Sequence, residues 1–392
     1  MKVWMKISLS ILCTITIAFV GFITLLFASL IGMEMFYQIL FPVGIGTILL
    51  LILSQIWGWF ENKWRLRVLG IVFGIIIVCV SIFEIKKSYE NSIDTINEQG
   101  VNLEQYEPFR KNTKAVILNE ESNLKLEGNL PKLDGATALY PLYSAFTKAV
   151  YPEDDYRVNI QKENDYVICT NTVGAYQRLI MGNADIIFVA GPSKEQLEDA
   201  KNSGVELEFT PIGKEAFVFF VNSKNSIDNL SVEDIQNIYS GNTTNWIEFG
   251  GKNVEIRAFQ RPDNSGSQTM LNKIMGNIKI MTPPQEDVAT GMGGIIKNVS
   301  SYKNYDNSIG YSFLFFASEM VNDNKIKLLS INDIYPNKEN VQNKTYPYSA
   351  EFYAVTLKGN DDENVKKLID WILSEQGQYL VEKTGYTRLE LV

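Results

Sequence analysis

Residue types that favour the binding of an oxyanion gather in one stretch, Arg261-Pro262-Asp263-Asn264-Ser265-Gly266-Ser267-Gln268-Thr269. The stretch places one guanidinium, two hydroxyls and a glycine at the start of a predicted helix, Gln268 to Met275. The first N–H groups of a helix have no partner within it and favour a bound anion. The apolar segment Val254 to Phe259 predicts a strand that leads into the stretch. Asn264 to Ser267 also has the composition of an ordinary turn, so the stretch alone does not establish a site.

Two further segments predict helices whose N-termini carry small or hydroxylated residues. Asp134 to Pro141 opens a helix that extends to Val150, with the proline in its first turn. Asn171 to Leu179 predicts a helix that ends at Gly182. Three helix N-termini can converge on one anion, because each adds N–H donors and the positive end of a helix dipole.

The chain contains no histidine, which removes the commonest general base, proton shuttle and metal ligand. Ser265 and Ser267 do not form the pattern of a nucleophile elbow. Only Cys169 lies outside the apolar N-terminal region, so no disulfide is expected beyond that region. We therefore expect a non-enzymatic protein without a metal or other cofactor.

Charge is distributed unevenly along the chain. Of 36 basic and 45 acidic residues, 5 and 3 lie in the first 85, which leaves 31 and 42 beyond them and a net charge of −11. Nucleic acids attract basic surfaces, so a nucleic-acid partner is not expected.

Three apolar runs occupy residues 1–86, namely Ile7 to Met33, Phe36 to Phe60 and Val68 to Ile85. Each is near the length of roughly 20 residues that spans a bilayer as a helix. We expect a membrane domain with three transmembrane helices in contact with the lipid bilayer. A cleaved signal peptide is not expected, because no small-residue cleavage site follows the first run and two further runs come after it.

Basic residues precede the first run and fill the loop between the second and third: Lys2, Lys6, Lys63, Arg65 and Arg67. The positive-inside rule places both segments in the cytoplasm. Lys86 and Lys87 are weak evidence against this orientation, unless they snorkel from the outer end of the third helix. The sequence predicts a multi-pass protein of the plasma membrane with an extracytoplasmic C-terminal domain. The polar residues 87–129 are expected to form a stalk or linker.

Short apolar segments alternate with helical patterns from residue 130 onward. Strands are predicted at Asp185 to Val189, Ala216 to Val221 and Ser308 to Phe313. This alternation is typical of an α/β fold.

The order of these motifs closely resembles the periplasmic phosphate-binding proteins of the PstS type, the solute receptors of ABC phosphate importers, over about residues 130–391. Asn229 to Gly241, followed by Thr244 to Trp246, is similar to a specific stretch of that family. Tyr346 to Ser349 and Lys383 to Thr387 are similar to the family's closing segments. Several weak motifs in the family's order make the resemblance specific.

The resemblance implies the type 2 periplasmic-binding-protein fold, a two-lobe α/β domain, here preceded by three transmembrane α-helices. Residues 130–392 would form this substrate-binding domain. Lobe 1 would comprise about residues 130–212 and 346–392, and lobe 2 about residues 213–345. In that family the two lobes close on the ligand like a hinge.

The resemblance also implies the ligand-binding residues, which are Thr137, Ala138, Leu139, Thr172, Arg261, Ser265, Gly266 and Ser267. Arg261 would hold two oxygens of the anion with its planar guanidinium. The hydroxyls and backbone N–H groups would donate further hydrogen bonds. Considered without the family, Thr137 and Thr172 have the alternative role of helix N-caps, and Arg261 that of a solvated surface charge.

One position departs from the family's pattern. Many phosphate receptors have an acidic ligand after the strand that here begins at Asp185, where this chain has Val189-Ala190-Gly191-Pro192. A carboxylate at that position accepts the proton of phosphate and rejects fully ionised sulfate, so the preference for phosphate is left open. Glu215 is either a substitute for that carboxylate or a solvated hinge residue. Asp185 is expected to be structural.

We expect a membrane-anchored extracytoplasmic solute-binding protein for phosphate or a related tetrahedral oxyanion, which delivers ligand to ABC permease and ATPase subunits. A membrane sensor or regulatory protein with the same fold is the alternative, because three spans exceed what anchoring requires. A receptor for another anion, such as molybdate, tungstate, sulfate or an organic phosphate, is the third hypothesis.

Overall fold

The computed structural model describes residues 2–30, 35–59, 62–92, 95–97, 102–159, 165–282, 301–320 and 325–390. The chain divides into two compact units, Met1–Ser92 and Ile93–Val392, and each is described by itself. The predicted ends of the first two spans, Met33 and Phe60, lie outside the described residues.

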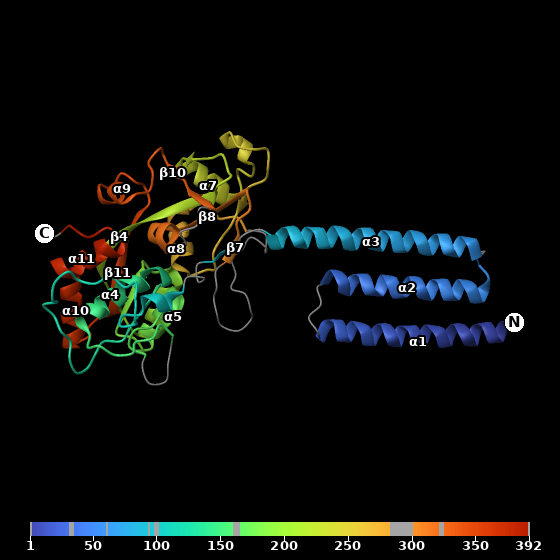
Figure 1. Cartoon of the computed structure of the whole chain (residues 1–392), viewed down its shortest axis with the longest axis horizontal. Helices are drawn as coiled ribbons and strands as arrows, with labels where there is room; N and C mark the ends of the chain where they lie inside the picture. Colours follow the sequence, from blue (N-terminus) through green and yellow to red (C-terminus); the bar gives the residue numbers. More distant parts are fainter. Residues whose placement is uncertain are drawn as a thin grey trace. The chain divides into compact units, whose positions relative to one another are not determined.

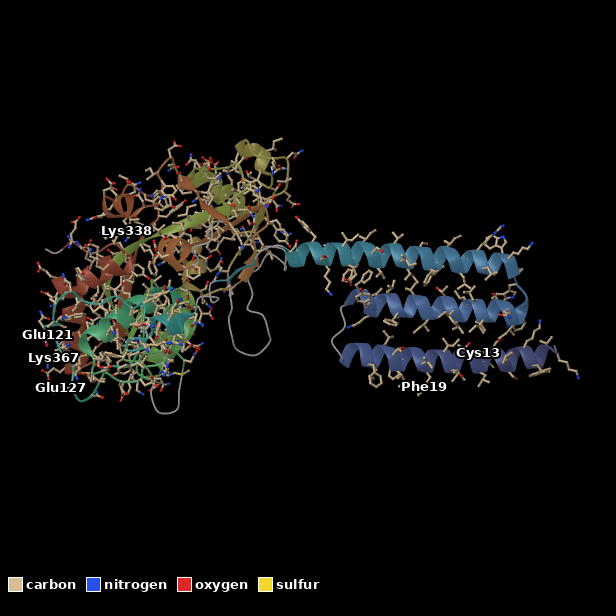
Figure 2. All side chains as sticks on the ribbon, in the orientation of Figure 1. Cys13, Phe19, Glu121, Glu127, Lys338 and Lys367 are labelled. Atoms are coloured by element: carbon tan, nitrogen blue, oxygen red, sulfur yellow. The ribbon has the colours of Figure 1, made fainter. Side chains whose placement is uncertain are left out.

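The first unit consists of three long helices, α1 (Val3–Leu30), α2 (Met35–Trp57) and α3 (Asn62–Ser92) (Figure 1). Apolar segments of 25, 22 and 24 residues within them are long enough to cross a membrane. Their exposed side chains are largely hydrocarbon, as Phe19 on α1 illustrates, whereas charged tips are dense on the second unit (Figure 2). The prediction of three apolar helices that can span a membrane is therefore confirmed, and α3 continues past its predicted end at Ile85.

Polar and aromatic contacts join the three helices. The indole N–H of Trp57 on α2 donates to the hydroxyl of Ser10 on α1 at 3.0 Å. The Tyr37 hydroxyl on α2 donates to the Glu84 carboxylate on α3. The neighbouring rings of Phe36 and Phe83 stack with centroids 4.1 Å apart. Such pairing matters because an unpaired polar group is costly among apolar side chains or lipid.

A seven-stranded sheet organises the second unit, in the order β2-β3-β11-β4-β8-β6, with β9 also paired to β4. Its strands are β2 (Leu133–Gly135), β3 (Ile186–Ala190), β4 (Leu207–Asn222), β6 (Arg257–Ala258), β8 (Ser308–Phe313), β9 (Ile326–Leu328) and β11 (Ser349–Leu357). β2 runs parallel to β3, and β6 parallel to β8. β11 is antiparallel to both β3 and β4, and β8 is antiparallel to β4.

The predicted strand from Val254 to Phe259 is much shorter in the structure, where only β6 joins the sheet. Its first part pairs instead with the preceding loop. The N–H of Trp246 donates to the carbonyl of Val254 at 3.1 Å, and the N–H of Ile256 donates to that of Thr244 at 2.8 Å. The backbone hydrogen bonds of this part are therefore satisfied outside the sheet.

Helices and short strands complete the second unit. The helices are α4 (Tyr140–Val150), α5 (Asn171–Ile180), α6 (Lys194–Asn202), α7 (Val232–Ser240), α8 (Gly266–Met275), α9 (Lys338–Gln342), α10 (Glu363–Leu373) and α11 (Glu375–Thr384). Shorter helical turns are η1 (Leu103–Tyr106), η2 (Thr137–Leu139), η3 (Trp246–Phe249) and η5 (Phe316–Met320). Two small sheets pair β1 (Thr95–Asn97) with β7 (Ser301–Lys303), and β5 (Asn229–Leu230) with β10 (Ser330–Ile331).

Strand β4 passes through two hydrophobic cores. Its residues 207–216 pair with β11, and its residues 217–221 pair with β8. The first core contains the buried side chains of Phe146, Phe188 and Trp371, and the second contains Phe217, Tyr239 and Trp246. Two half-sheets, each with its own core, thus share one strand (Figure 1).

Residues near the predicted domain limits pack on the two cores. Residues 87–129 were expected to form a linker, yet Leu126 is buried in the first core and Leu103 packs against it. Tyr346 and Tyr348, assigned by sequence to lobe 1, are buried in the second core. The few apolar residues of a mostly polar segment give a weak local signal, and their partners are distant in sequence. The limits of the lobes stay a prediction.

Glu215 lies on β4 near the point where the strand passes from the first core to the second, and only 6% of its surface is exposed. Its carboxylate accepts a hydrogen bond of 2.6 Å from the N–H of Phe315. The rings of Phe315 and Tyr386 pack 4.7 Å apart and belong to the first core. Burial raises the pKa of Glu215 to about 8. Glu215 is therefore not the solvated hinge carboxylate of the sequence-based interpretation.

Substitution of Glu215 by Gln should remove a pH dependence of stability. The pKa of about 8 in the folded state lies above the value of about 4.3 for an unfolded chain. Ionisation of Glu215 therefore destabilises the folded state relative to the unfolded chain. As a result, the free energy of unfolding falls as pH rises from about 4 to about 8. Glutamine keeps the acceptor for the Phe315 N–H but does not ionise. Across this pH range, we expect the free energy of unfolding of the variant to rise relative to that of wild type by on the order of a few kcal/mol.

The measurement is urea denaturation of the full chain in detergent at a series of pH values. Glu206→Gln is the control, because the Glu206 side chain is 70% exposed, and its profile should follow wild type. Parallel profiles for Glu215→Gln and wild type would contradict the expectation.

Candidate functional site

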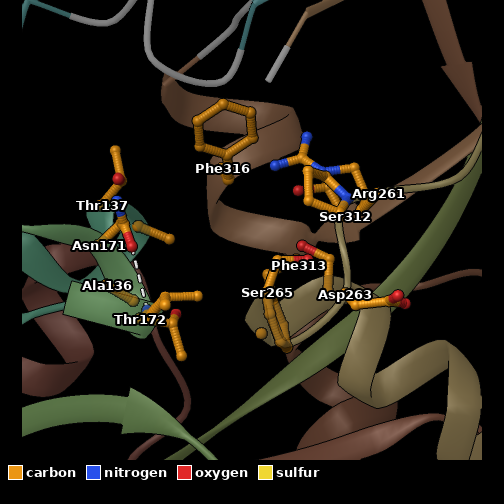
Figure 3. A pocket seen from close by; sticks show the side chains of 15 residues that line it. Ala136, Thr137, Asn171, Thr172, Arg261, Asp263, Ser265, Ser312, Phe313 and Phe316 are labelled. Atoms are coloured by element: carbon orange, nitrogen blue, oxygen red, sulfur yellow. Dashed lines mark hydrogen bonds between the residues drawn. The ribbon is translucent and has the colours of Figure 1, made fainter. Parts of the chain in front are cut away.

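A cavity of about 220 Å³ lies in the second unit, with walls that come from both half-sheets. One wall is built from residues 136–138 and 171–173, and the other from residues 261–263, 265–267, 312, 313 and 316 (Figure 3). Seven of the eight predicted binding residues line it: Thr137, Ala138, Thr172, Arg261, Ser265, Gly266 and Ser267. Segments far apart in the sequence therefore meet where the resemblance implies a ligand site.

Turn η2 brings Thr137 and Ala138 to the cavity directly after β2. As the first residues of a helical turn, they have N–H groups without an acceptor inside that turn. Leu139 differs, because its N–H donates to the carbonyl of Ala136 at 2.9 Å and it does not line the cavity. The Tyr386 hydroxyl donates to the carbonyl of Ala138 and fixes the turn from the C-terminal segment.

Asp134 joins the two segments of this first wall. Its buried carboxylate accepts hydrogen bonds from the N–H groups of Gly135 at 2.7 Å and Thr170 at 2.8 Å. It also accepts from the Thr170 hydroxyl at 2.7 Å and pairs with Arg178 at 3.1 Å. Burial raises the pKa of Asp134 to about 6, although these hydrogen bonds oppose the shift. One carboxylate therefore positions the residues that lead into both η2 and α5.

Helix α5 is capped by Asn171, the residue at which the predicted helix opens. Asn171 has a left-handed backbone with φ of 67°, which asparagine tolerates better than most residues. Its side-chain oxygen accepts from the N–H groups of Val173 at 3.0 Å and Gly174 at 3.3 Å. Neither Thr137 nor Thr172 makes a side-chain cap. The N-cap interpretation of both threonines is wrong, and two of the N–H groups expected to face a ligand already have an acceptor.

The second wall is built around the start of α8, which begins at Gly266 rather than at Gln268. Ser265 is its N-cap, and its hydroxyl oxygen accepts from the N–H of Gln268 at 3.2 Å. The N–H groups of Gly266 and Ser267 have no acceptor within the helix, and both residues line the cavity. Donors from the backbone and from hydroxyls are thus concentrated at one helix end.

Hydrogen bonds from the backbone N–H of Arg261 fix the position of this residue. Its N–H donates to the side-chain oxygen of Gln268 at 2.9 Å and to the Tyr311 hydroxyl at 3.0 Å, and that hydroxyl donates to Gln268 in turn. The guanidinium lies on the same wall as Ser312 and across the cavity from Thr137 (Figure 3). Arg261 is partly buried and lines the cavity, so it is not a fully solvated surface charge.

The two walls touch each other beside the cavity. A Cβ added to Gly266 would lie 3.3 Å from the Thr172 hydroxyl oxygen, so a side chain would press against the opposite wall. Asn264 accepts through its carbonyl from the Gln196 side chain at 3.1 Å, and its own amide donates to the Glu195 carboxylate. Glu195 and Gln196 begin α6, which follows β3. The loop that carries Arg261 is therefore tied to the other half of the domain.

Gly191 follows β3 where the resemblance implies an acidic ligand, and it lies close to the ammonium group of Lys273. A Cβ added to Gly191 would lie 2.6 Å from the ammonium nitrogen of Lys273 on α8. Desolvation lowers the pKa of Lys273. Asp185 accepts from the N–H of Lys132 at 2.7 Å, as expected for a structural residue, and neither Asp185 nor Glu215 lines the cavity. Within the described part of the chain, the acidic residue that does line it is Asp263, which is exposed.

Several lining residues were not predicted. They are Ala136, Asn171, Val173, Pro262, Asp263, Ser312, Phe313 and Phe316. Asp263 and Pro262 lie inside the Arg261 stretch and were visible to sequence inspection. Ser312, Phe313 and Phe316 gave no local signal, because they reach the cavity only through the pairing of β8 with β4.

The chemistry of the cavity is that of a donor cage. It offers one guanidinium, several hydroxyls and free N–H groups at two helical starts. Among the described residues, His, Cys, Asp and Glu side chains form no group of three or more that could hold a metal ion. Such a set of donors suits a tetrahedral oxyanion, whose oxygens accept several hydrogen bonds each.

Known proteins share this domain. A family model described as the PBP superfamily domain matches residues 130–376. The phosphate-binding protein PstS of Bacillus subtilis is 27% identical over 265 residues, which cover 67% of this chain and 81% of the relative. The phosphate-binding protein PstS of Borreliella burgdorferi is 26% identical over 198 residues, which cover 50% of this chain and 68% of the relative.

A solved structure gives the same result for the fold. A putative phosphate ABC transporter substrate-binding protein from Clostridium perfringens, with bound phosphate, is 25% identical and has a TM-score of 0.51. The match covers 67% of this chain and 100% of that protein. These relatives are named as binding proteins, in agreement with the expectation of a non-enzymatic protein. The chain belongs to the PBP superfamily, with a PstS-like α/β binding domain that follows three long apolar helices.

Proposed function

We propose that this chain is a membrane-anchored solute-binding protein for phosphate or a related tetrahedral oxyanion. The observation that supports it is the cavity in which Arg261 and the start of α8 face Thr137, Ala138 and Thr172. An oxyanion taken from water loses its hydrogen bonds, and that loss is costly unless protein donors replace them. Donors are divided between the two walls, so a bound anion would favour their approach.

Roles follow from the chemistry of each group. Arg261 supplies charge and a planar pair of donors, and charge-assisted hydrogen bonds are the strong ones. Ser265, Ser267 and Thr172 supply hydroxyls, while Gly266 and Ala138 supply N–H groups. Leu139 contributes only indirectly, because its N–H is already bonded within η2. Phosphate is the first candidate ligand, because the relatives are named phosphate-binding proteins.

Fully ionised tetrahedral anions such as sulfate, molybdate and tungstate are the second candidate ligands. Lys273 lies beside Gly191, where a carboxylate would be needed to accept the proton of a protonated anion. Gly191 and Lys273 line a hollow that shares Gly266 and Phe313 with the cavity. A cation so near the cavity favours ligands with more negative charge.

Transport and sensing both remain proposals for the physiological role. Transport would deliver the ligand to ABC permease and ATPase subunits, as the name of the Clostridium perfringens protein suggests. Sensing is favoured by one feature of the segment that follows α3. Its strand β1 pairs with β7, just before β8 of the second core, whereas Leu103 and Leu126 pack on the first core. The described residues of this segment therefore contact β7 as well as the first core.

Replacement of Arg261 by Ala should lower the affinity for phosphate by about a hundredfold or more, because two charge-assisted hydrogen bonds of about 1.5 to 3 kcal/mol each would be lost. The measurement is calorimetry of the full chain in detergent. Arg257→Ala is the matched control, since the Arg257 guanidinium lies over the Tyr305 ring at 4.1 Å and does not line the cavity. Equal affinities for wild type and Arg261→Ala would exclude this cavity as the anion site.

The proposed orientation places the binding domain outside the cytoplasm. In a chain whose three cysteines are replaced by Ser, Cys introduced at the exposed Lys338 should react with a membrane-impermeant maleimide in intact cells. Cys introduced at Lys63, at the start of α3, should react only after permeabilisation. The reverse pattern would place the domain in the cytoplasm.

A further inference from the structure

The cavity is larger than a bare tetrahedral oxyanion requires. Its volume is about 220 Å³. A single water molecule needs roughly 10 to 15 Å³ of the space measured in this way. The cavity therefore has room for more heavy atoms than the four oxygens and the central atom of a tetrahedral anion.

Part of the wall is hydrocarbon. Phe313 and Phe316 come from the second wall, and Ala136 and Val173 from the first. The ring of Phe316 lies at one end of the cavity, between Thr137 and Arg261 in the view of Figure 3. Phe316 is 3% exposed, and the N–H of its neighbour Phe315 is bonded to buried Glu215. The ring is therefore a built part of the wall.

These surfaces suit a ligand with one apolar end. A bare oxyanion has four oxygens that all need donors, and an oxygen against a phenyl ring or a valine has none. A carbon substituent on the phosphoryl group replaces that unsatisfied contact with apolar burial, which is favourable in proportion to area. The dianion of a phosphate monoester also has no proton to donate above its second pKa of about 6. It therefore does not require the carboxylate that is absent near Ala190.

We propose that the cavity binds a small monosubstituted phosphoryl anion, a phosphate monoester or phosphonate with a compact apolar group, more tightly than inorganic phosphate. The inference rests on the proposed oxyanion-binding function. The phosphoryl oxygens face Arg261, Thr172 and the start of α8. The substituent packs against Phe316 and Val173.

Calorimetry of the full chain in detergent at pH 8 tests the proposal with inorganic phosphate, methyl phosphate, ethyl phosphate and ethylphosphonate. Each buried CH₂ group strengthens binding by about fourfold, so ethyl phosphate should bind about tenfold more tightly than inorganic phosphate. Phe316→Ala should abolish this preference, so that the variant binds ethyl phosphate no more tightly than inorganic phosphate.

A second variant fills the space instead of emptying it. Val173 is partly exposed on the wall of the cavity. Val173→Phe should lower the affinity for ethyl phosphate by at least about tenfold, while inorganic phosphate still binds. Val232→Phe is the matched control, because Val232 is also partly exposed, lies in the first turn of α7 and does not line the cavity. It should leave all affinities unchanged. If Phe316→Ala fails to fold, Val173→Phe decides the question.

The outcomes separate this inference from the proposed function. Inorganic phosphate bound as tightly as the esters would overturn the inference and leave oxyanion binding intact. An ester preference that survives both Phe316→Ala and Val173→Phe would also overturn it, because the substituent would then lie elsewhere. No binding of any of these anions to wild type would refute the inference and count against the phosphate form of the proposed function.

Discussion

The binding domain depends on one covalent constraint, which is that β4 belongs to two hydrophobic cores at once. Residues 207–216 are bonded to β11, and residues 217–221 to β8. The two half-sheets can therefore change their spacing only by bending this strand and the segments that cross beside it. Glu215 lies near this crossing, and its buried carboxylate accepts a hydrogen bond from the N–H of Phe315. Phe315 directly precedes η5, which begins at Phe316. The crossing and one wall of the cavity are thus linked by a hydrogen bond.

Each wall of the cavity is positioned by residues behind it. Asp134 ties the approach to η2 and α5 together on one side, and Gln268 with Tyr311 fixes the backbone of Arg261 on the other. Buried hydrogen-bonded groups of this kind set the geometry of donors before a ligand arrives, which lowers the cost of ordering them on binding. The two walls meet at Gly266, where the absence of a side chain allows contact with Thr172.

The three apolar helices and the binding domain call for different surroundings. The helices expose hydrocarbon such as Phe19, which is stable in lipid, and pair their few polar groups among themselves, as Tyr37 does with Glu84. The domain exposes charge and buries two cores. The strand β1 and the packed residues Leu103 and Leu126 occupy the region that polar composition marked as a linker.

Local chemistry in the sequence was enough to predict the three apolar helices, the α/β alternation and the Arg261 stretch. Apolar length, strand alternation and the residue types around a helix start are all local properties. Tertiary structure decided which groups face one another. The N–H of Leu139 is not available to a ligand, because it donates to the carbonyl of Ala136. Asn171, and not a threonine, caps α5. Phe316 reaches the cavity only through strand pairing, and a contact between segments that are distant in the chain leaves no mark in the sequence near the residue.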